Sequence, residues 1–156
     1  MILANTYTQI YLQTVFAVKH RYGLIQTHWK EELYQYITGI VQQQGHKMLA
    51  INGMPDHIHV FMGINPKQSI SDLIQDIKGD SSKWINSNRF VKGHFEWQSG
   101  YGAFSYGHSQ IDLVVKYIQN QEMHHHQRSF LEEYTTFLRK FNVPYDEQYL
   151  FKPLDE

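Results

Sequence analysis

The spacing of hydrophobic residues along this chain switches between the alternation of a strand and the spacing of a helix. The order of these switches constrains the fold more than any other feature. Between Thr6 and Val18 apolar and polar residues alternate, which is the pattern of a β-strand. Residues 28–44 place large apolar side chains at helical spacing, and Gly45 is suited to end such a helix. Residues 46–52 and 57–63 read as strands again around a Pro/Asp turn, so a β-hairpin is expected.

The next part of the chain predicts a second helix and a further strand region. Ser69 is placed to cap a helix whose apolar positions run from Ile70 to Trp84. Gly79 weakens the middle of this helix. A strand or a pair of strands is expected around residues 95–105.

Two more helices are predicted near the C-terminus. Ser109 is placed to cap one that carries Leu113 to Gln121, and a capping-box pattern starts another at Ser129, ended by Pro144. The full order begins strand, helix, strand, strand, helix, strand. This order predicts an α+β fold, a ferredoxin-like (RRM-like) βαββαβ sandwich with an antiparallel sheet and C-terminal helices, one of them carrying Tyr117.

Length and composition limit the classes of protein that fit. A chain of 156 residues suggests a single domain over 1–156, with a core of about 6–126 and a C-terminal helix and tail at 129–156. The chain has no cysteine, so disulfides and cysteine zinc sites are excluded. It also lacks an apolar run long enough to span a membrane and a recognisable secretion signal. These features favour a cytoplasmic protein that is not bound to a membrane.

The charge pattern leaves the kind of partner open. The net charge of −1 argues against a protein that coats nucleic acid through charge alone. One short stretch nevertheless gathers four cations that could contact DNA, namely Lys78, Lys83, Arg89 and Lys92. Nearby acidic residues dilute this stretch, so a solvated surface explains it equally well. Aromatic residues make up 15% of the chain and serve either as core or as platforms for unpaired bases.

The sharpest chemical feature is the pair His57 and His59 in the strand predicted at 57–63. Residues two apart on a strand point to the same face, so the two imidazoles could hold one metal ion. The alternative is that both are polar residues on a solvated face of the sheet.

A second feature lies on the helix predicted to end at Gln121. Tyr117 and Gln121 are one helical turn apart and share a face. Gln121 could offer its amide oxygen to a metal, with Tyr117 within reach of whatever the metal polarises. The alternative is that both belong to an ordinary packing face of the helix.

These two features make chemical sense together. A tyrosine hydroxyl has a pKa near 10 and is a poor nucleophile at neutral pH. A divalent ion helps by neutralising and orienting a phosphate, and two histidines with one amide oxygen leave coordination positions open. Mixed nitrogen and oxygen ligands suit Mg²⁺ or Mn²⁺, and zinc remains open.

Several segments of this chain resemble the single-tyrosine HUH transposases, small enzymes that mobilise bacterial insertion sequences as single strands. The resemblance runs from about Tyr7 to Leu150 and follows the family order. It is carried by Pro55–Val60, which contains the histidine–hydrophobic–histidine motif, and by Lys78–Lys83, Trp97–Ser105 and Val115–Glu122. Members that act on dispersed palindromic repeats (REP-associated tyrosine transposases) belong to the same group.

The resemblance implies a role for each candidate residue. His57 and His59 would bind the metal, Gln121 would be its third ligand, and Tyr117 would be the nucleophile. It also implies a homodimer with composite active sites, recognition of a DNA hairpin, and a 5′-phosphotyrosine intermediate that is later rejoined to another 3′-hydroxyl.

Some residues and functions stay open at this point. Glu122 competes with Gln121 as a ligand because it is only one helical position away. No role is assigned to the three consecutive histidines His124, His125 and His126. The rival functions are a nicking protein with the same chemistry, a non-catalytic or domesticated ferredoxin-like nucleic-acid binding module, and a metal-dependent hydrolase that uses water.

Overall fold

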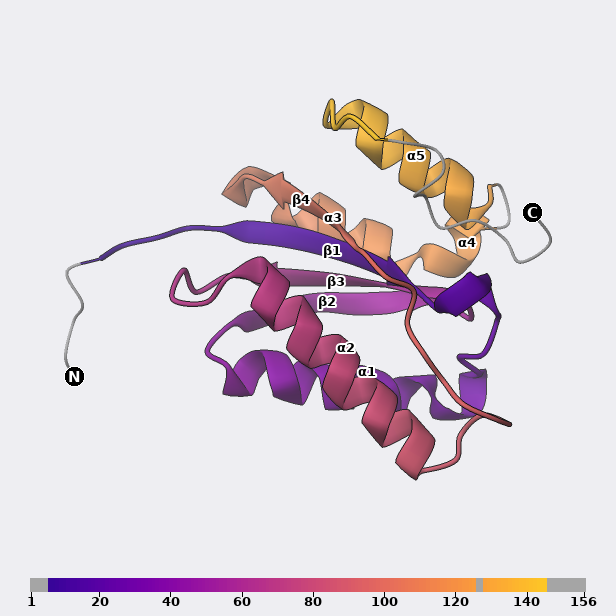
Figure 1. The fold of residues 1–156 in the computed structure, drawn as a ribbon. Helices are drawn as coiled ribbons and strands as arrows, with labels where there is room; N and C mark the ends of the chain where they lie inside the picture. The colour runs from indigo at the N-terminus through magenta and orange to yellow at the C-terminus, as the bar shows by residue number, and fades with distance from the viewer. Residues whose placement is uncertain (1–5, 126–127, 146–156) are drawn as a thin grey trace.

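The computed structural model describes residues 6–125 and 128–145, which form a sheet with helices on both of its faces (Figure 1). The sheet is antiparallel and has the order β2-β3-β1-β4. Its strands are β1 (Tyr11–Ala17), β2 (Lys47–Met54), β3 (His57–Gly63) and β4 (Gly102–Tyr106). The helices are α1 (Thr27–Gln43), α2 (Ile70–Ser87), α3 (Ile111–Gln119), α4 (Gln121–His125) and α5 (Phe130–Lys140), with short 3-10 turns η1 (Lys19–Arg21) and η2 (His108–Gln110).

The first six regular strands and α-helices follow the order β1, α1, β2, β3, α2, β4, so the predicted ferredoxin-like sandwich is confirmed. In Figure 1, α1 and α2 cover one face of the sheet, and α3, α4 and α5 cover the other. The sheet is therefore buried on both sides. One face carries the main core and the other carries the candidate site.

The pairing of β1 with β3 decides which side chains reach each face. Val15 lies opposite His59, and Ala17 lies opposite His57. Because neighbouring residues on a strand point to opposite faces, Phe16 and Ile58 point to the side of α1 and α2. Both histidines point to the other side. A shift of this register by one residue would exchange the two sets.

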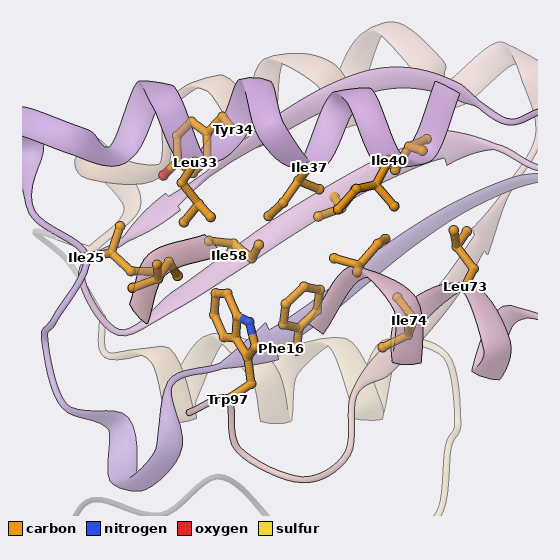
Figure 2. Close-up of a cluster of buried hydrophobic side chains, with 14 of the residues drawn as sticks. Phe16, Ile25, Leu33, Tyr34, Ile37, Ile40, Ile58, Leu73, Ile74 and Trp97 are labelled. Atoms are coloured by element: carbon orange, nitrogen blue, oxygen red, sulfur yellow. The ribbon is translucent and has the colours of Figure 1, made fainter. Parts of the chain in front are cut away.

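The core between the sheet and α1 and α2 is the largest cluster of buried apolar side chains among the described residues. Figure 2 shows this cluster, whose labelled members are Phe16, Ile25, Leu33, Tyr34, Ile37, Ile40, Ile58, Leu73, Ile74 and Trp97. Burial of each large apolar side chain stabilises the fold by about 1.5–3 kcal/mol. Packing on this scale anchors the back of β3, so the histidines on its front have a firm support.

Local signals in the sequence set most helix ends. Ser69 and Ser129 cap α2 and α5, each accepting a hydrogen bond from the backbone N–H three residues later. Gly45 follows α1 with a positive φ of 89°, as expected of a glycine that ends a helix. Gly79 does not interrupt α2, because the packed face of the helix outweighs its low propensity.

One expectation about local structure is confirmed only in part, and two are wrong. The strand expected around 95–105 is limited to β4, and only an isolated bridge between Val18 and Trp97 forms before it. Ser109 does not cap a helix, because it lies within η2. The tyrosine helix does not extend to Gln121, since α3 ends at Gln119 and α4 is a separate short helix.

Among the described residues, no helix is both long and apolar enough to cross a membrane.

Gly53 on β2 gives a test of how tightly the hairpin of β2 and β3 is packed. A Cβ atom at Gly53 would lie 2.2 Å from the carbonyl oxygen of His57 and 2.8 Å from the Cα of Ile58. These are backbone atoms that cannot rotate away. We expect Gly53→Ala to lower the free energy of unfolding by about 2–3 kcal/mol in urea denaturation.

Gly39→Ala is the matched control, because Gly39 is exposed on α1 and an added Cβ there meets nothing within 4 Å. This change should raise the free energy of unfolding by about 0.5–1 kcal/mol through helix propensity. If the free energy of unfolding changes equally in both variants, the close contact of Gly53 with the backbone of β3 is not what excludes a side chain there.

Candidate active site

His57 and His59 lie side by side on β3 and are both fully buried under the second helical layer. The Nδ1 atom of each imidazole is hydrogen-bonded to a side-chain oxygen. His57 Nδ1 is 2.7 Å from Asp56 Oδ1, and His59 Nδ1 is 2.7 Å from Gln13 Oε1. Since both partners are acceptors, each Nδ1 carries a proton, and each Nε2 faces into the site. Metal-binding histidines are commonly oriented in this way. The alternative of a solvated face is wrong.

Glu133 on α5 lies at the centre of this site, and the sequence analysis missed it. Its side chain is only 1% exposed. Its Oε1 is 3.1 Å from His59 Nε2 and 3.5 Å from His57 Nε2. The signal was a glutamate on the apolar face of α5, three residues after Phe130 and four before Phe137.

Tyr117 of α3 brings its hydroxyl to the same place. The hydroxyl donates a hydrogen bond to Glu133 Oε2, and Arg128 Nη2 donates to the hydroxyl oxygen at 3.2 Å. The ring lies 6.2 Å from that of His59 between centroids. In this structure the Tyr117 hydroxyl therefore lies beside the histidine pair of the same chain.

Gln121 is fully buried and takes part in the site, but it arrives on α4 and not on the tyrosine helix. Its Oε1 is 3.3 Å from His57 Nε2, and its Nε2 donates to Glu133 Oε2 at 3.2 Å. The break between α3 and α4 has a tertiary cause. Asn52 of β2 donates its Nδ2 to the carbonyl oxygens of Ile118 and Gln119, at 3.0 and 3.2 Å, and so satisfies the end of α3.

His124 and His125, which follow Gln121, contact different residues of the site. His125 Nε2 is 3.1 Å from Glu133 Oε1, which adds a third imidazole to the cluster. The ring of His124 stacks on Tyr117 with centroids 4.2 Å apart. His126 lies outside the described residues. Glu122 is exposed and 3.7 Å from Lys30, so it points away from the site and leaves Gln121 as the residue that faces it.

The electrostatics of the site centre on the buried carboxylate. Burial would raise the pKa of Glu133, but hydrogen bonds from His125, His57 and His59 hold that pKa far below its usual range. Burial and the charge of Glu133 raise the pKa of Tyr117, against a smaller opposing effect of Arg128. The phenol therefore stays protonated at neutral pH in this state. Burial lowers the pKa of His57, but its bonds to Asp56 and Glu133 outweigh that effect and raise it.

The donor set fits a divalent metal ion. Ligand atoms of His57, His125 and Glu133 all lie within 4.8 Å of one another. Both motif histidines present Nε2, and Gln121 adds an amide oxygen. Imidazole nitrogen together with carboxylate and amide oxygen is a common ligand set for divalent ions.

A cavity of about 260 Å³ lies beside the nucleophile candidate. Its lining includes Tyr117 and Glu133 together with two cationic residues, Arg128 and Lys140. Both cations lie outside the basic stretch between Lys78 and Lys92 that the sequence pattern singles out.

The basic stretch singled out in the sequence lies elsewhere. Lys83 on α2 and Arg89 and Lys92 just after it are exposed, and α2 covers the sheet face opposite the histidines (Figure 1). Lys78 has a structural contact, since its Nζ donates to the carbonyl oxygens of Gln98 and Gly100 at 2.8 and 2.6 Å. Burial lowers the pKa of Lys78 to about 8.

Comparison with known proteins places this chain in a family. Residues 6–121 match the family model described as "Transposase IS200 like". The ISDra2 transposase TnpA of Deinococcus radiodurans is 23% identical over 118 residues, covering 72% of this chain and 84% of that protein.

Two solved structures share the fold at low sequence identity. A protein of Deinococcus radiodurans R1, described as a candidate transposase, has a TM-score of 0.62 at 21% identity, covering 78% of this chain and 97% of that one. A REP-associated tyrosine transposase bound to a REP hairpin has a TM-score of 0.59 at 14% identity, covering 80% of this chain and 74% of that one. Since the family match spans the sheet, both motif histidines, Tyr117 and Gln121, this chain belongs to the IS200-like transposase family.

Proposed function

We propose that this transposase cleaves and rejoins single-stranded DNA by metal-assisted transesterification, with Tyr117 as the nucleophile. The observation that carries the proposal is the position of the Tyr117 hydroxyl. It contacts Glu133, and that carboxylate in turn contacts the Nε2 atoms of His57 and His59. A nucleophile and a metal-binding pair held within one small site are the parts that such a reaction needs.

The reaction needs no external energy source, because each step exchanges one phosphoester bond for another. Tyr117 Oη forms a bond to phosphorus while the bond from phosphorus to the 3′ oxygen breaks. The phenol loses its proton and the 3′ oxygen gains one, which leaves a 5′-phosphotyrosine and a free 3′-hydroxyl. A second 3′-hydroxyl reverses these steps and joins the strands, because the intermediate keeps the phosphoester bond energy.

His57, His59 and Gln121 would hold the metal, which we assign as Mg²⁺ or Mn²⁺. When bound, such an ion acts as a Lewis acid on a phosphate oxygen and orients the phosphate. Asp56 and Gln13 keep the two imidazoles in the orientation that presents Nε2. Arg128, which donates to the Tyr117 hydroxyl oxygen, would stabilise the phenolate as the proton leaves.

We assign the substrate as single-stranded DNA carrying a hairpin, since the REP-associated neighbour was solved bound to a REP hairpin. Lys83, Arg89 and Lys92 would hold the hairpin stem on the α2 side, away from the chemistry. The cavity at Tyr117 would receive the strand to be cut. We further propose a cytoplasmic homodimer, in which exchange of the tyrosine helix between subunits would build the composite sites that the resemblance implies.

Replacement of Tyr117 tests the proposed nucleophile. With manganese and single-stranded oligonucleotides from the DNA flanking the gene, the protein should form a covalent DNA adduct visible on a denaturing gel. Tyr117→Phe should form no adduct, because it lacks the attacking oxygen. Tyr36→Phe is the control and should keep the adduct, since Tyr36 on α1 stacks on Trp84 on the opposite side of the sheet from the histidines.

The other outcomes identify the rival functions. Metal-dependent cleavage without an adduct would indicate a hydrolase that uses water. Hairpin binding with neither cleavage nor adduct would indicate a non-catalytic binding protein. An adduct that survives in Tyr117→Phe would show that another residue is the nucleophile.

Gln13→Leu tests the orientation of His59. Gln13 is 1% exposed, and its loss removes the acceptor for His59 Nδ1. We expect Mn²⁺ affinity, measured by isothermal titration calorimetry, to fall by about 10–100-fold. Gln9→Leu, at an exposed position, should leave it unchanged. Equal affinity in all three proteins would show that Gln13 does not orient a metal ligand.

Lys92→Ala tests the proposed hairpin contact. A lysine that contacts phosphate should contribute about one unit to the slope of log K against log salt concentration. We expect Lys92→Ala to reduce this slope by about one in hairpin-binding titrations. Lys67→Ala, in the loop before α2, should leave the slope unchanged. If Lys92→Ala and Lys67→Ala have the same salt slope, Lys92 does not contact the DNA hairpin.

A further inference from the structure

A carboxylate buried among imidazoles is unusual, because burial of a charge is costly unless it is paired. Glu133 is in this position, at 1% exposure, and it lies outside both the HUH pair and the segment of Tyr117 and Gln121. We infer that Glu133 on α5 is itself a ligand of the metal ion, so that the C-terminal helix takes part in the metal site. This inference rests on the proposed metal-dependent function and adds a ligand to it.

The spacing of the polar atoms supports this assignment. Glu133 Oε1 lies 3.1 Å from His59 Nε2, 3.1 Å from His125 Nε2 and 3.5 Å from His57 Nε2. Two ligand atoms that bind one ion at about 2.1 Å lie about 3.0–3.4 Å apart at octahedral or tetrahedral angles. The carboxylate oxygen therefore lies close to ligand spacing from each of the three imidazole nitrogens. The ligand atoms of His57, His125 and Glu133 also lie within 4.8 Å of one another.

The chemistry of the donors points the same way. Two neutral imidazoles and an amide bring no negative charge to a divalent ion. Magnesium and manganese prefer hard oxygen ligands, and carboxylates most of all. Within the described residues, Glu133 is the glutamate that reaches the Nε2 atoms of the motif histidines.

Packing holds this carboxylate in place. Ser129 caps α5, and Phe137 and Leu138 on the same helix are buried against the sheet. The two oxygens of Glu133 have different partners. Oε1 faces the imidazoles, and Oε2 accepts hydrogen bonds from Tyr117 and Gln121. Glu133 can therefore bind an ion through Oε1 while Oε2 positions the hydroxyl of the nucleophile.

Mn²⁺ binding tests the inference without any DNA reaction. Free Mn²⁺ is followed by electron paramagnetic resonance during titration of the full-length protein, with folding checked by circular dichroism. Glu133→Gln has nearly the same shape as the native residue but lacks its charge. We expect it to weaken Mn²⁺ binding by about 10–100-fold relative to wild type. Glu132→Gln is the matched control, since Glu132 is exposed on the same helix, and should bind as wild type does.

The other results overturn the inference in distinguishable ways. Unchanged affinity in Glu133→Gln, with binding lost in His57→Ala, would keep the proposed metal site and remove Glu133 from it. Tighter binding in Glu133→Gln would show that the carboxylate competes with the ion for the histidines. Absence of Mn²⁺ binding by wild type would overturn the metal-dependent function as well.

A measurement on the wild type keeps the inference testable if Glu133→Gln fails to fold. Anomalous scattering from crystals of the native protein soaked in Mn²⁺ locates the ion directly. We expect it at bonding distance from Glu133 Oε1, about 2.2 Å. An ion bound by His57 and His59 but remote from Glu133 would overturn the inference.

Discussion

The antiparallel pairing of β1 with β3 is the constraint on which the rest of this structure depends. It sets Val15 opposite His59 and Ala17 opposite His57, so that β1 also supplies Gln13 to hold the ring of His59. The back of the same strands is fixed by the core with α1 and α2. The histidines therefore stand on a surface that cannot shift without exposing apolar side chains to water.

Above that surface the site is closed by α3, α4 and α5, which pack on the sheet through clusters separate from the core with α1 and α2. Helices α3, α4 and α5 each contribute one or more groups: Tyr117, then Gln121 and His125, then Glu133. The charged carboxylate at the centre ties these segments to β3. Burial, together with the charge of this carboxylate, raises the pKa of Tyr117 and keeps its hydroxyl protonated in this state. A change in these contacts would alter both the position and the protonation of the Tyr117 hydroxyl.

Much of the fold could be predicted because its signals are local. Alternation and helical spacing identified the strands and the long helices, and Ser69, Ser129 and Gly45 marked helix ends. One error occurred where a distant residue decides the outcome. Asn52 of β2 satisfies the carbonyl groups at the end of α3, so the tyrosine helix stops before Gln121. Glu133 and Arg128 belong to the site, but they lie in a part of the chain where no sequence motif indicates a functional residue.

The sequence by itself determined the order of the secondary structure, the shared face of His57 and His59, and the candidate chemistry of Tyr117 and Gln121. These depend on side-chain period and residue type, which are properties of short segments. Only the tertiary structure decided that the histidines are buried, that Lys78 is held by backbone carbonyls, and that Glu133 and His125 meet the histidine pair. Burial and charge pairing between segments far apart in the chain depend on how helices pack on the sheet, and no local pattern encodes that.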